Sequence, residues 1–191
     1  MLVAACSLRA RGVAPAAPLT YCTGRYSRKA APLNAIDWLV KQHRRMEASF
    51  EAALEGGAGS QRALFDETAD LLMSHVLVEE EHFYPAVEAK RTKDVLLESL
   101  EEHLSLKRVL ADLVALPEGD EHFVPKLHVL KEQAEHHHKE EEEHLFPKAR
   151  KLLADAELAA LGERMEAAQL KLLEEQPRKR AASQTEAAAK L

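Results

Sequence analysis

The chain has few of the residues that interrupt helices or that are enriched in sheets. Of its 191 residues only 7 are glycine and 8 are proline, and aromatic side chains make up 5%. Apolar residues nevertheless reach 46% and charged residues 30%, with an abundance of Ala, Leu, Glu and Lys, which favour helices. This length and composition predict one all-α domain.

Cysteine is nearly absent. Cys6 and Cys22 both lie in the first 22 residues, so the chain from Asn34 onward has no disulfide and no thiolate ligand. Any metal there needs His and carboxylate ligands. No apolar run approaches the roughly 18 to 20 residues of a membrane span, and a net charge of −6 without a basic face disfavours nucleic acid. We expect a soluble monomer or weak oligomer.

The first 33 residues contain no acidic side chain. Five basic residues stand there among Ala, Ser, Thr and Pro: Arg9, Arg11, Arg25, Arg28 and Lys29. This composition predicts an organellar transit peptide, for a mitochondrion or plastid, or a disordered leader on a cytoplasmic protein. Residues 176–191 predict a disordered tail. Its final Ala-Lys-Leu is similar to a peroxisomal Ser-Lys-Leu address, although chance explains such a match better in an Ala-rich tail.

Residues 34–175 show the three- and four-residue periodicity of amphipathic helices. Asn34 is placed to cap the first helix, with Asp37 as an acidic residue in its first turn. Pro125 falls where a fourth helix begins, a position that tolerates proline. The apolar pattern after Pro147 predicts an additional C-terminal helix on the outside of a bundle.

One segment occurs twice. HVLVEEEHFYP, residues 75–85, and HHKEEEEHLFP, residues 137–147, share a His, three acids, a second His, an aromatic residue and Pro at the same offsets. His43 precedes His75 by 32 residues, and His103 precedes His137 by 34. Each of these two histidines lies on the apolar stripe of the helix before its copy. The unit is a duplicated helical hairpin. Two such hairpins predict an antiparallel, up-down four-helix bundle.

A bundle of this kind brings the inward stripes of its helices to a common axis. His and Glu four residues apart share one helix face and can bind the same ion. Left unpaired in a dry core, such groups cost several kcal/mol each, and a bound cation removes that cost. Nitrogen and oxygen ligands without sulfur favour iron or manganese, with zinc as a further option. The inward polar residues are His43, His75, Glu79, His103, His137 and Glu141.

At these positions the sequence resembles the hemerythrin family, specifically its HHE cation-binding branch. In that branch a lone helical His is followed by an H-xxx-EE-xx-(L/F)-(F/Y)-P helix. The resemblance spans 35–175. It implies a non-haem centre of two Fe ions, bridged by Glu79 and Glu141, that reacts with dioxygen, peroxide or nitric oxide, or reports iron availability. It assigns as metal ligands the six inward residues: His43, His75, Glu79, His103, His137 and Glu141.

The sequence departs from the oxygen-carrying hemerythrins in two places. Those carriers have a second His four residues before the His of the third helix, and here that residue is Ser99, which disfavours oxygen transport. They also place the carboxylate of the fourth helix five residues after its His. That spacing makes Glu142 a rival of Glu141, although the symmetry of the repeat favours Glu141.

Further polar residues lie in and next to the two copies of the repeat, and none of them belongs to the six assigned ligands. His82 and His144 lie on the inward stripes, one turn beyond the glutamates, and are predicted to be core residues or neighbours of the ligands. Helical phase turns His136 and His138 toward solvent. Tyr84 is predicted to pack at a helix end, with a hydrogen bond near the site as an alternative. Four acids are predicted to be surface charges: Glu80, Glu81, Glu142 and Glu143.

Three functions fit these features. The first is a protein that binds or senses dioxygen, nitric oxide or iron. The second is a di-iron enzyme that acts on peroxide or donates iron to repair iron centres. The third is a metal-free helical interaction module. The sequence shows no Gly-rich phosphate loop and no nucleophile beside an inward His, so no catalytic residue is assigned.

Overall fold

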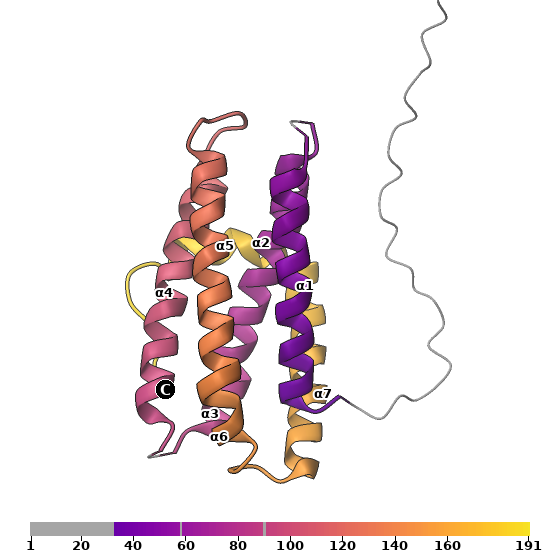
Figure 1. Ribbon diagram of the computed structural model, residues 1–191, viewed down its shortest axis with the longest axis vertical. Helices are drawn as coiled ribbons and strands as arrows, with labels where there is room; N and C mark the ends of the chain where they lie inside the picture. The colour runs from indigo at the N-terminus through magenta and orange to yellow at the C-terminus, as the bar shows by residue number, and fades with distance from the viewer. Residues whose placement is uncertain (1–32, 58, 90) are drawn as a thin grey trace, which may run out of the picture.

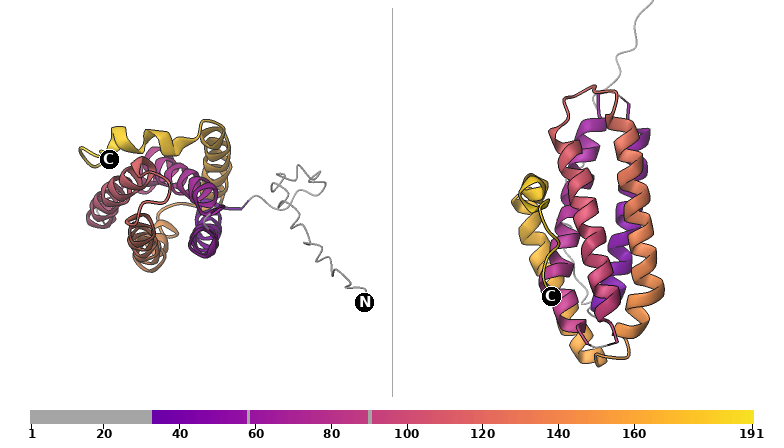
Figure 2. Two further views of the ribbon diagram at one scale, coloured as in Figure 1. Left: turned by 90° about the horizontal axis from the view of Figure 1, so that it is seen from above. Right: turned by 90° about the vertical axis from the view of Figure 1, so that its left-hand side faces the viewer.

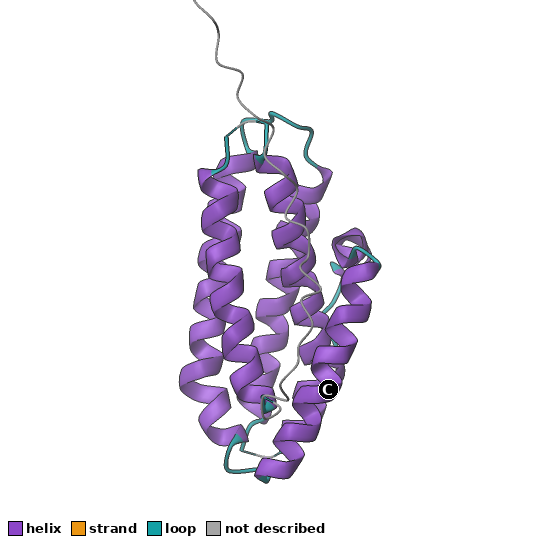
Figure 3. Cartoon of the chain, turned by 90° about the vertical axis from the view of Figure 1, so that its right-hand side faces the viewer, coloured by secondary structure: helices purple, strands orange, loops and turns teal. Residues whose placement is uncertain are grey.

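The computed structural model describes residues 33–57, 59–89 and 91–191. The predicted leader, residues 1–33, lies outside this part apart from Leu33. Four long helices run side by side in alternating directions (Figure 1), which confirms the predicted bundle: α1 (Ala35–Glu55), α2 (Gln61–Val78), α4 (Lys93–Ala115) and α5 (Phe123–Glu140). Their connections gather at the two ends (Figure 3). No helix of the described residues is long and apolar enough to cross a membrane.

The starts of α1 and α5 follow the sequence signals. The Asn34 side chain accepts a hydrogen bond from the backbone N–H of Asp37 at 3.0 Å, and its amide donates to the Asp37 carboxylate at 2.8 Å. This contact satisfies one of the backbone donors that a helix leaves free at its start. Pro125 is the third residue of α5, where its missing N–H breaks no helical hydrogen bond. Both predictions are confirmed.

The two copies of the repeat contain a feature that the sequence analysis missed. After α2 and α5 the chain widens into π-helical turns, η1 (Glu79–Phe83) and η2 (Glu141–Leu145). One α-helical turn follows each of them, α3 (Tyr84–Val87) and α6 (Phe146–Ala149). A proline offers no N–H to the carbonyl four residues back and crowds that carbonyl. A wide turn just ahead of each proline lets the helix continue past it.

The hydrophobic core is divided into two clusters. Along each long helix and the short turns that continue it, residues of one cluster precede the inward histidine or glutamate and residues of the other follow it. One cluster includes Phe50, Phe65, Leu72, Leu110 and Leu127. The other includes Ile36, Leu39, Phe83, Leu96 and Leu145. The His and Glu side chains therefore form a polar layer with apolar packing above and below it.

The additional C-terminal helix is present as α7 (Asp155–Glu174), which packs against α1 and α2 (Figure 2). Its buried face includes Leu158, Leu161 and Met165. At Gly162 a Cβ atom would lie 2.4 Å from the carbonyl oxygen of Leu33. Only glycine therefore lets α7 come this close to the residues that lead into α1.

The end of the chain differs from the predicted disordered tail. Residues Pro177–Gln184 form a 3-10 helix, η3, that lies across α2 and α4 (Figure 2). The backbone N–H of Arg178 donates to the Asp70 carboxylate at 3.0 Å, and its guanidinium pairs with Asp70 and Asp66. Ala181 is fully buried in the core. Specific contacts with α2 thus order a segment whose composition is polar.

Two neighbouring alanines in η3 allow a direct test of this packing. We expect Ala181→Asp to lower the free energy of unfolding by about 2 to 4 kcal/mol, because it places a carboxylate in an apolar site. Ala182→Asp, at an exposed position, serves as the matched control and is expected to leave stability unchanged. Thermal unfolding of the two variants gives the comparison, and equal midpoints would show that η3 is not packed on the bundle.

Candidate metal centre

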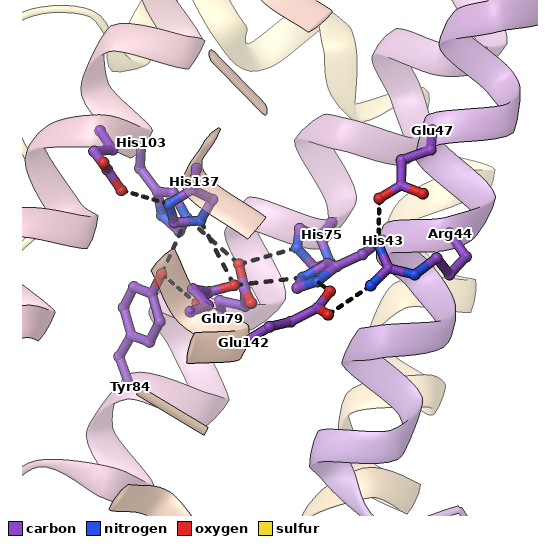
Figure 4. Close-up of polar contacts among 11 residues, drawn as sticks. His43, Arg44, Glu47, His75, Glu79, Tyr84, His103, His137 and Glu142 are labelled. Carbon is purple, nitrogen blue, oxygen red and sulfur yellow. Dashed lines mark hydrogen bonds and ion pairs between the residues drawn. The ribbon is translucent and has the colours of Figure 1, made fainter. Parts of the chain in front are cut away.

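The structure brings all six predicted site residues together in the polar layer, and all are buried (Figure 4). Four histidines come one from each long helix, and the two glutamates are the first residues of the π turns. One group consists of His43, His75, Glu79 and Glu141. A second group consists of Glu79, His103 and His137, and in each group one ligand-type atom per residue lies within 4.8 Å of the others. Glu79 belongs to both groups.

Each glutamate lies between histidines of the two hairpins. Oε2 of Glu79 is 3.2 Å from Nε2 of His75 and 3.4 Å from Nε2 of His103. Oε2 of Glu141 is 3.4 Å from Nε2 of His43 and 3.7 Å from Nε2 of His137. Neither Oε2 atom has a hydrogen-bond partner. This is the position that a carboxylate bridging two ions requires.

Carboxylates outside this cluster fix three of the imidazole rings. Nδ1 of His43 is 2.8 Å from Glu142, Nδ1 of His103 is 3.1 Å from Glu80, and Nδ1 of His137 is 2.8 Å from Glu102. An Nδ1–H donated to a carboxylate leaves Nε2 as the free nitrogen, directed at the centre. The geometry therefore places Glu141 inside the cluster and its rival Glu142 on the outer side of His43.

The prediction that Glu80 and Glu142 are surface charges was wrong. They occupy equivalent positions of the repeat, and each contacts the lone histidine of the other hairpin. Glu80 also accepts hydrogen bonds from Lys107 at 2.7 and 2.8 Å, and Glu142 accepts one from Arg44 at 2.5 Å. Burial acts to raise the pKa of Glu80, but the hydrogen bonds from His103 and Lys107 outweigh it and lower that pKa. Both carboxylates remain charged beside the rings.

The closest contact within the cluster is between two histidines. Nε2 of His103 lies 2.9 Å from Nε2 of His137, and Nδ1 of each ring already contacts a carboxylate. Two nitrogen lone pairs at this distance repel each other unless a proton or a cation lies between them. Burial, with the charge of His137, lowers the pKa of His103 to about 4, so a shared proton is disfavoured at neutral pH. A metal cation satisfies both nitrogens.

The two glutamates of the cluster differ in their charge. Burial and the neighbouring Glu141 raise the pKa of Glu79 well above its usual value. Burial acts in the same direction on Glu141, but the nearby His137 and His43 outweigh it and lower the pKa of Glu141. Burial, with the charge of His43, keeps the pKa of His75 well below its usual value. The cluster therefore contains an ionised Glu141 beside the neutral imidazoles of His75 and His103, which are able to bind a cation.

Tyr84 is part of the site, as the alternative prediction for this residue proposed. Its hydroxyl donates a hydrogen bond to Oε1 of Glu141 at 3.0 Å and lies 3.1 Å from Nε2 of His103 (Figure 4). Its ring stacks on His103 with centroids 5.3 Å apart, as Phe146 stacks on His43 at 5.7 Å. Burial and the charge of Glu141 raise the pKa of Tyr84 well above its usual value. The phenol therefore keeps its proton.

Three histidines lie elsewhere than predicted, and one buried serine lies outside the cluster. His144 is exposed and His82 half-buried, because each π turn holds one extra residue and rotates the following side chains off the inward stripe. His138, predicted to be solvated, is buried beside His43 and His75. Its counterpart in the repeat is the apolar Val76, which was the one sequence signal for burial. Ser99 is buried, but it belongs to neither group of ligand-type residues.

Comparisons with known proteins agree with this geometry. A solved structure of a hemerythrin HHE cation-binding domain-containing protein from Mycobacterium kansasii superposes with a TM-score of 0.67 at 25% sequence identity. The match covers 75% of this chain and 89% of that one. A search among curated proteins found no match. Residues 34–149 match the family described as Hemerythrin HHE cation binding domain, and the chain belongs to that family.

Proposed function

We propose that the polar layer holds two iron ions, and that the protein binds or senses dioxygen, nitric oxide or iron. One observation carries the proposal: His103 and His137 direct their Nε2 atoms at each other across 2.9 Å, within reach of the unpaired Glu79 carboxylate. A buried arrangement of this kind is unfavourable without a cation. Imidazole and carboxylate ligands suit iron, and four-helix bundles hold di-iron carboxylate sites.

The residues of the chain would divide the site into two halves. His43 and His75 would hold one ion, His103 and His137 the other, with Glu79 and Glu141 between them. Bound iron would supply one-electron chemistry and affinity for small diatomic ligands. The carboxylates of Glu80, Glu102 and Glu142 would keep three rings in the tautomer that offers Nε2 to the metal.

Tyr84 favours reversible binding over turnover. A phenol whose pKa is raised well above its usual value is a poor proton donor, but it is a well-placed hydrogen-bond donor. Its hydroxyl is held between Glu141 and His103 in a site where every neighbouring side chain is buried. Such a group can orient and stabilise a bound anion or polar ligand without giving up its proton.

The test is metal analysis combined with an absorption spectrum, taken without oxygen and then in air or with nitric oxide. We expect close to two irons per chain and a near-ultraviolet band that appears on exposure to the gas. His75→Ala is expected to lose iron, whereas His136→Ala, at a side chain 66% exposed, keeps it. Chains that retain no iron, or a spectrum that responds to neither gas, would contradict the proposal. Rapid peroxide consumption by the loaded protein would favour the enzyme instead.

A further inference from the structure

His138 is a buried titratable residue that the six-residue cluster does not use. Its side chain is 2% exposed, and neither of its ring nitrogens has a hydrogen-bond partner. The ring stacks on His43 with centroids 4.0 Å apart and planes 7° apart, and it meets His75 edge-on at 5.5 Å. An imidazole with two unpaired nitrogens in a dry core is as costly as the unpaired ligand atoms around it.

The direction of His138 follows from its place on α5. Consecutive residues of a helix point about 100° apart, and α5 packs between α4 and α1. His137 therefore faces His103 on α4, and His138 faces His43 on α1. One nitrogen from each of His43, His75 and His138 lies within 4.8 Å of the others. The side of the centre that holds His43 and His75 thus has a third imidazole within reach.

The repeat shows that this third imidazole belongs to one half of the site alone. The equivalent residue of the first copy is Val76, which is buried in the core. The opposite half has Tyr84 and Glu102, whose equivalents in the repeat are Phe146 and Gln42. The two halves of a duplicated unit therefore differ in their polar side chains: an imidazole on one side, a phenol and a carboxylate on the other.

A surface cavity borders the His138 side of the cluster. This cavity of about 280 Å³ is lined by His138, by four glutamates and by two basic residues: Glu47, Glu135, Glu142, Glu143, Arg44 and Lys139. None of the four histidines of the cluster lines this cavity. Four carboxylates against two basic side chains leave this lining negatively charged, which favours the approach of cations.

We infer that His138 is a further metal ligand, the third imidazole for the ion held by His43 and His75. This inference rests on the proposed di-metal function. With His138 the centre has five histidines, three for one ion and two for the other, together with the two carboxylates. An unequal division leaves the ion at His103 and His137 with fewer protein ligands, and therefore with the more open coordination sphere.

Proton NMR of the cobalt(II)-loaded chain tests the inference, because each imidazole bound to a paramagnetic ion gives its own strongly shifted, solvent-exchangeable N–H resonance. We expect five such resonances in the natural chain and four in His138→Val, which installs the residue found in the other copy. Competition with a chelator is expected to show that one of two cobalt ions binds at least about 10-fold more weakly in this variant. His136→Val is the matched control, with five resonances and unchanged affinity.

A second variant separates metal binding from packing. His138→Phe keeps an aromatic ring on His43 but has no nitrogen, and it is expected to give the same four resonances and the same loss of affinity. Circular dichroism of the metal-free variants checks that they fold. Four resonances in the natural chain, or five in a folded His138 variant, would overturn the role of His138 while leaving the di-metal centre in place. A natural chain without shifted resonances would overturn both.

Discussion

Ferrous iron in excess is expected to raise the midpoint of thermal unfolding of the metal-free chain by roughly 8 to 16 °C for each ion bound. Free metal at about 1,000 times its dissociation constant adds about 4 kcal/mol to the free energy of unfolding. In a chain of this size 1 kcal/mol shifts the midpoint by about 2 to 4 °C. The physical origin is the polar layer, whose unpaired nitrogen and oxygen atoms gain a partner only when the ion binds the folded chain.

Calorimetry under anaerobic conditions, with a chelator added afterwards, measures this shift and its reversal. His75→Ala is the test variant, and its midpoint is expected to respond little to iron. His144→Ala, at an exposed position one turn beyond Glu141, is the control and is expected to respond as fully as the natural chain. A midpoint that neither iron nor chelator moves would support the metal-free interaction module.

Glu79→Gln is expected to stabilise the metal-free chain and to remove its response to iron. Both carboxylate oxygens of Glu79 are buried without a hydrogen-bond partner, and burial together with Glu141 raises its pKa well above the usual value. An amide is neutral at any pH, whereas the Glu79 carboxyl must bind a proton to be buried without a charge, so we expect a gain of about 1 to 3 kcal/mol in the free energy of unfolding at neutral pH. The same change removes the carboxylate shared by both halves of the site.

The pH dependence of this gain has a definite sign. Between the usual glutamate pKa of 4.5 and the raised pKa of Glu79, the folded chain binds a proton that the unfolded chain does not. The contribution of Glu79 to stability therefore falls as the pH rises through that window. The difference between Glu79→Gln and the natural chain is expected to grow from pH 4 toward pH 7. Glu81→Gln, at an exposed neighbour, is expected to show no such trend.

Denaturation of both metal-free variants by urea at several pH values gives these differences, and a parallel titration with iron gives the response to metal. A Glu79→Gln chain that is less stable than the natural one at neutral pH would contradict the assignment of an unfavourable buried carboxylate. A variant that still gains stability from iron would contradict the bridging position of Glu79.

The repeat made the bundle and the positions of the six cluster residues predictable. Helical periodicity alone predicts more inward-facing positions than a metal site needs. The two copies of the repeat, which have the same offsets, identify His75 with Glu79 and His137 with Glu141 as the pairs that form the site. A spacing of four residues survives in the structure because each histidine lies on α2 or α5 and its glutamate is the first residue of the π turn that follows. The inward positions of His43 and His103 were predicted from the apolar stripe of the helix that precedes each copy.

The π turns could not be predicted from periodicity, which assumes one constant pitch. Past Glu79 and Glu141 the extra residue changes the helical phase, so the inward prediction fails for His82 and His144. The same change brings Tyr84 into the site, five residues after Glu79. Pro85 and Pro147 were the local signal, because a proline inside a helix needs such an adjustment.

His138, Glu80 and the tail were mispredicted for a different reason. A helix packed between two neighbours buries more than one stripe, so the residue next to His137 on α5 faces α1 and is covered as well. Glu80 points inward because it contacts His103 and Lys107. The helix η3 is held against α2 by the contact of its Arg178 with Asp70. These are contacts between residues far apart in sequence, and neither local pattern nor composition contains them.

Anomalous X-ray diffraction at the iron absorption edge, from crystals of the iron-loaded chain, would locate each iron ion in the bundle. We expect two anomalous peaks inside the bundle, one beside His43 and His75 and one beside His103 and His137, both within bonding distance of Glu79. A single peak, or peaks confined to exposed histidines such as His136 and His144, would contradict this expectation.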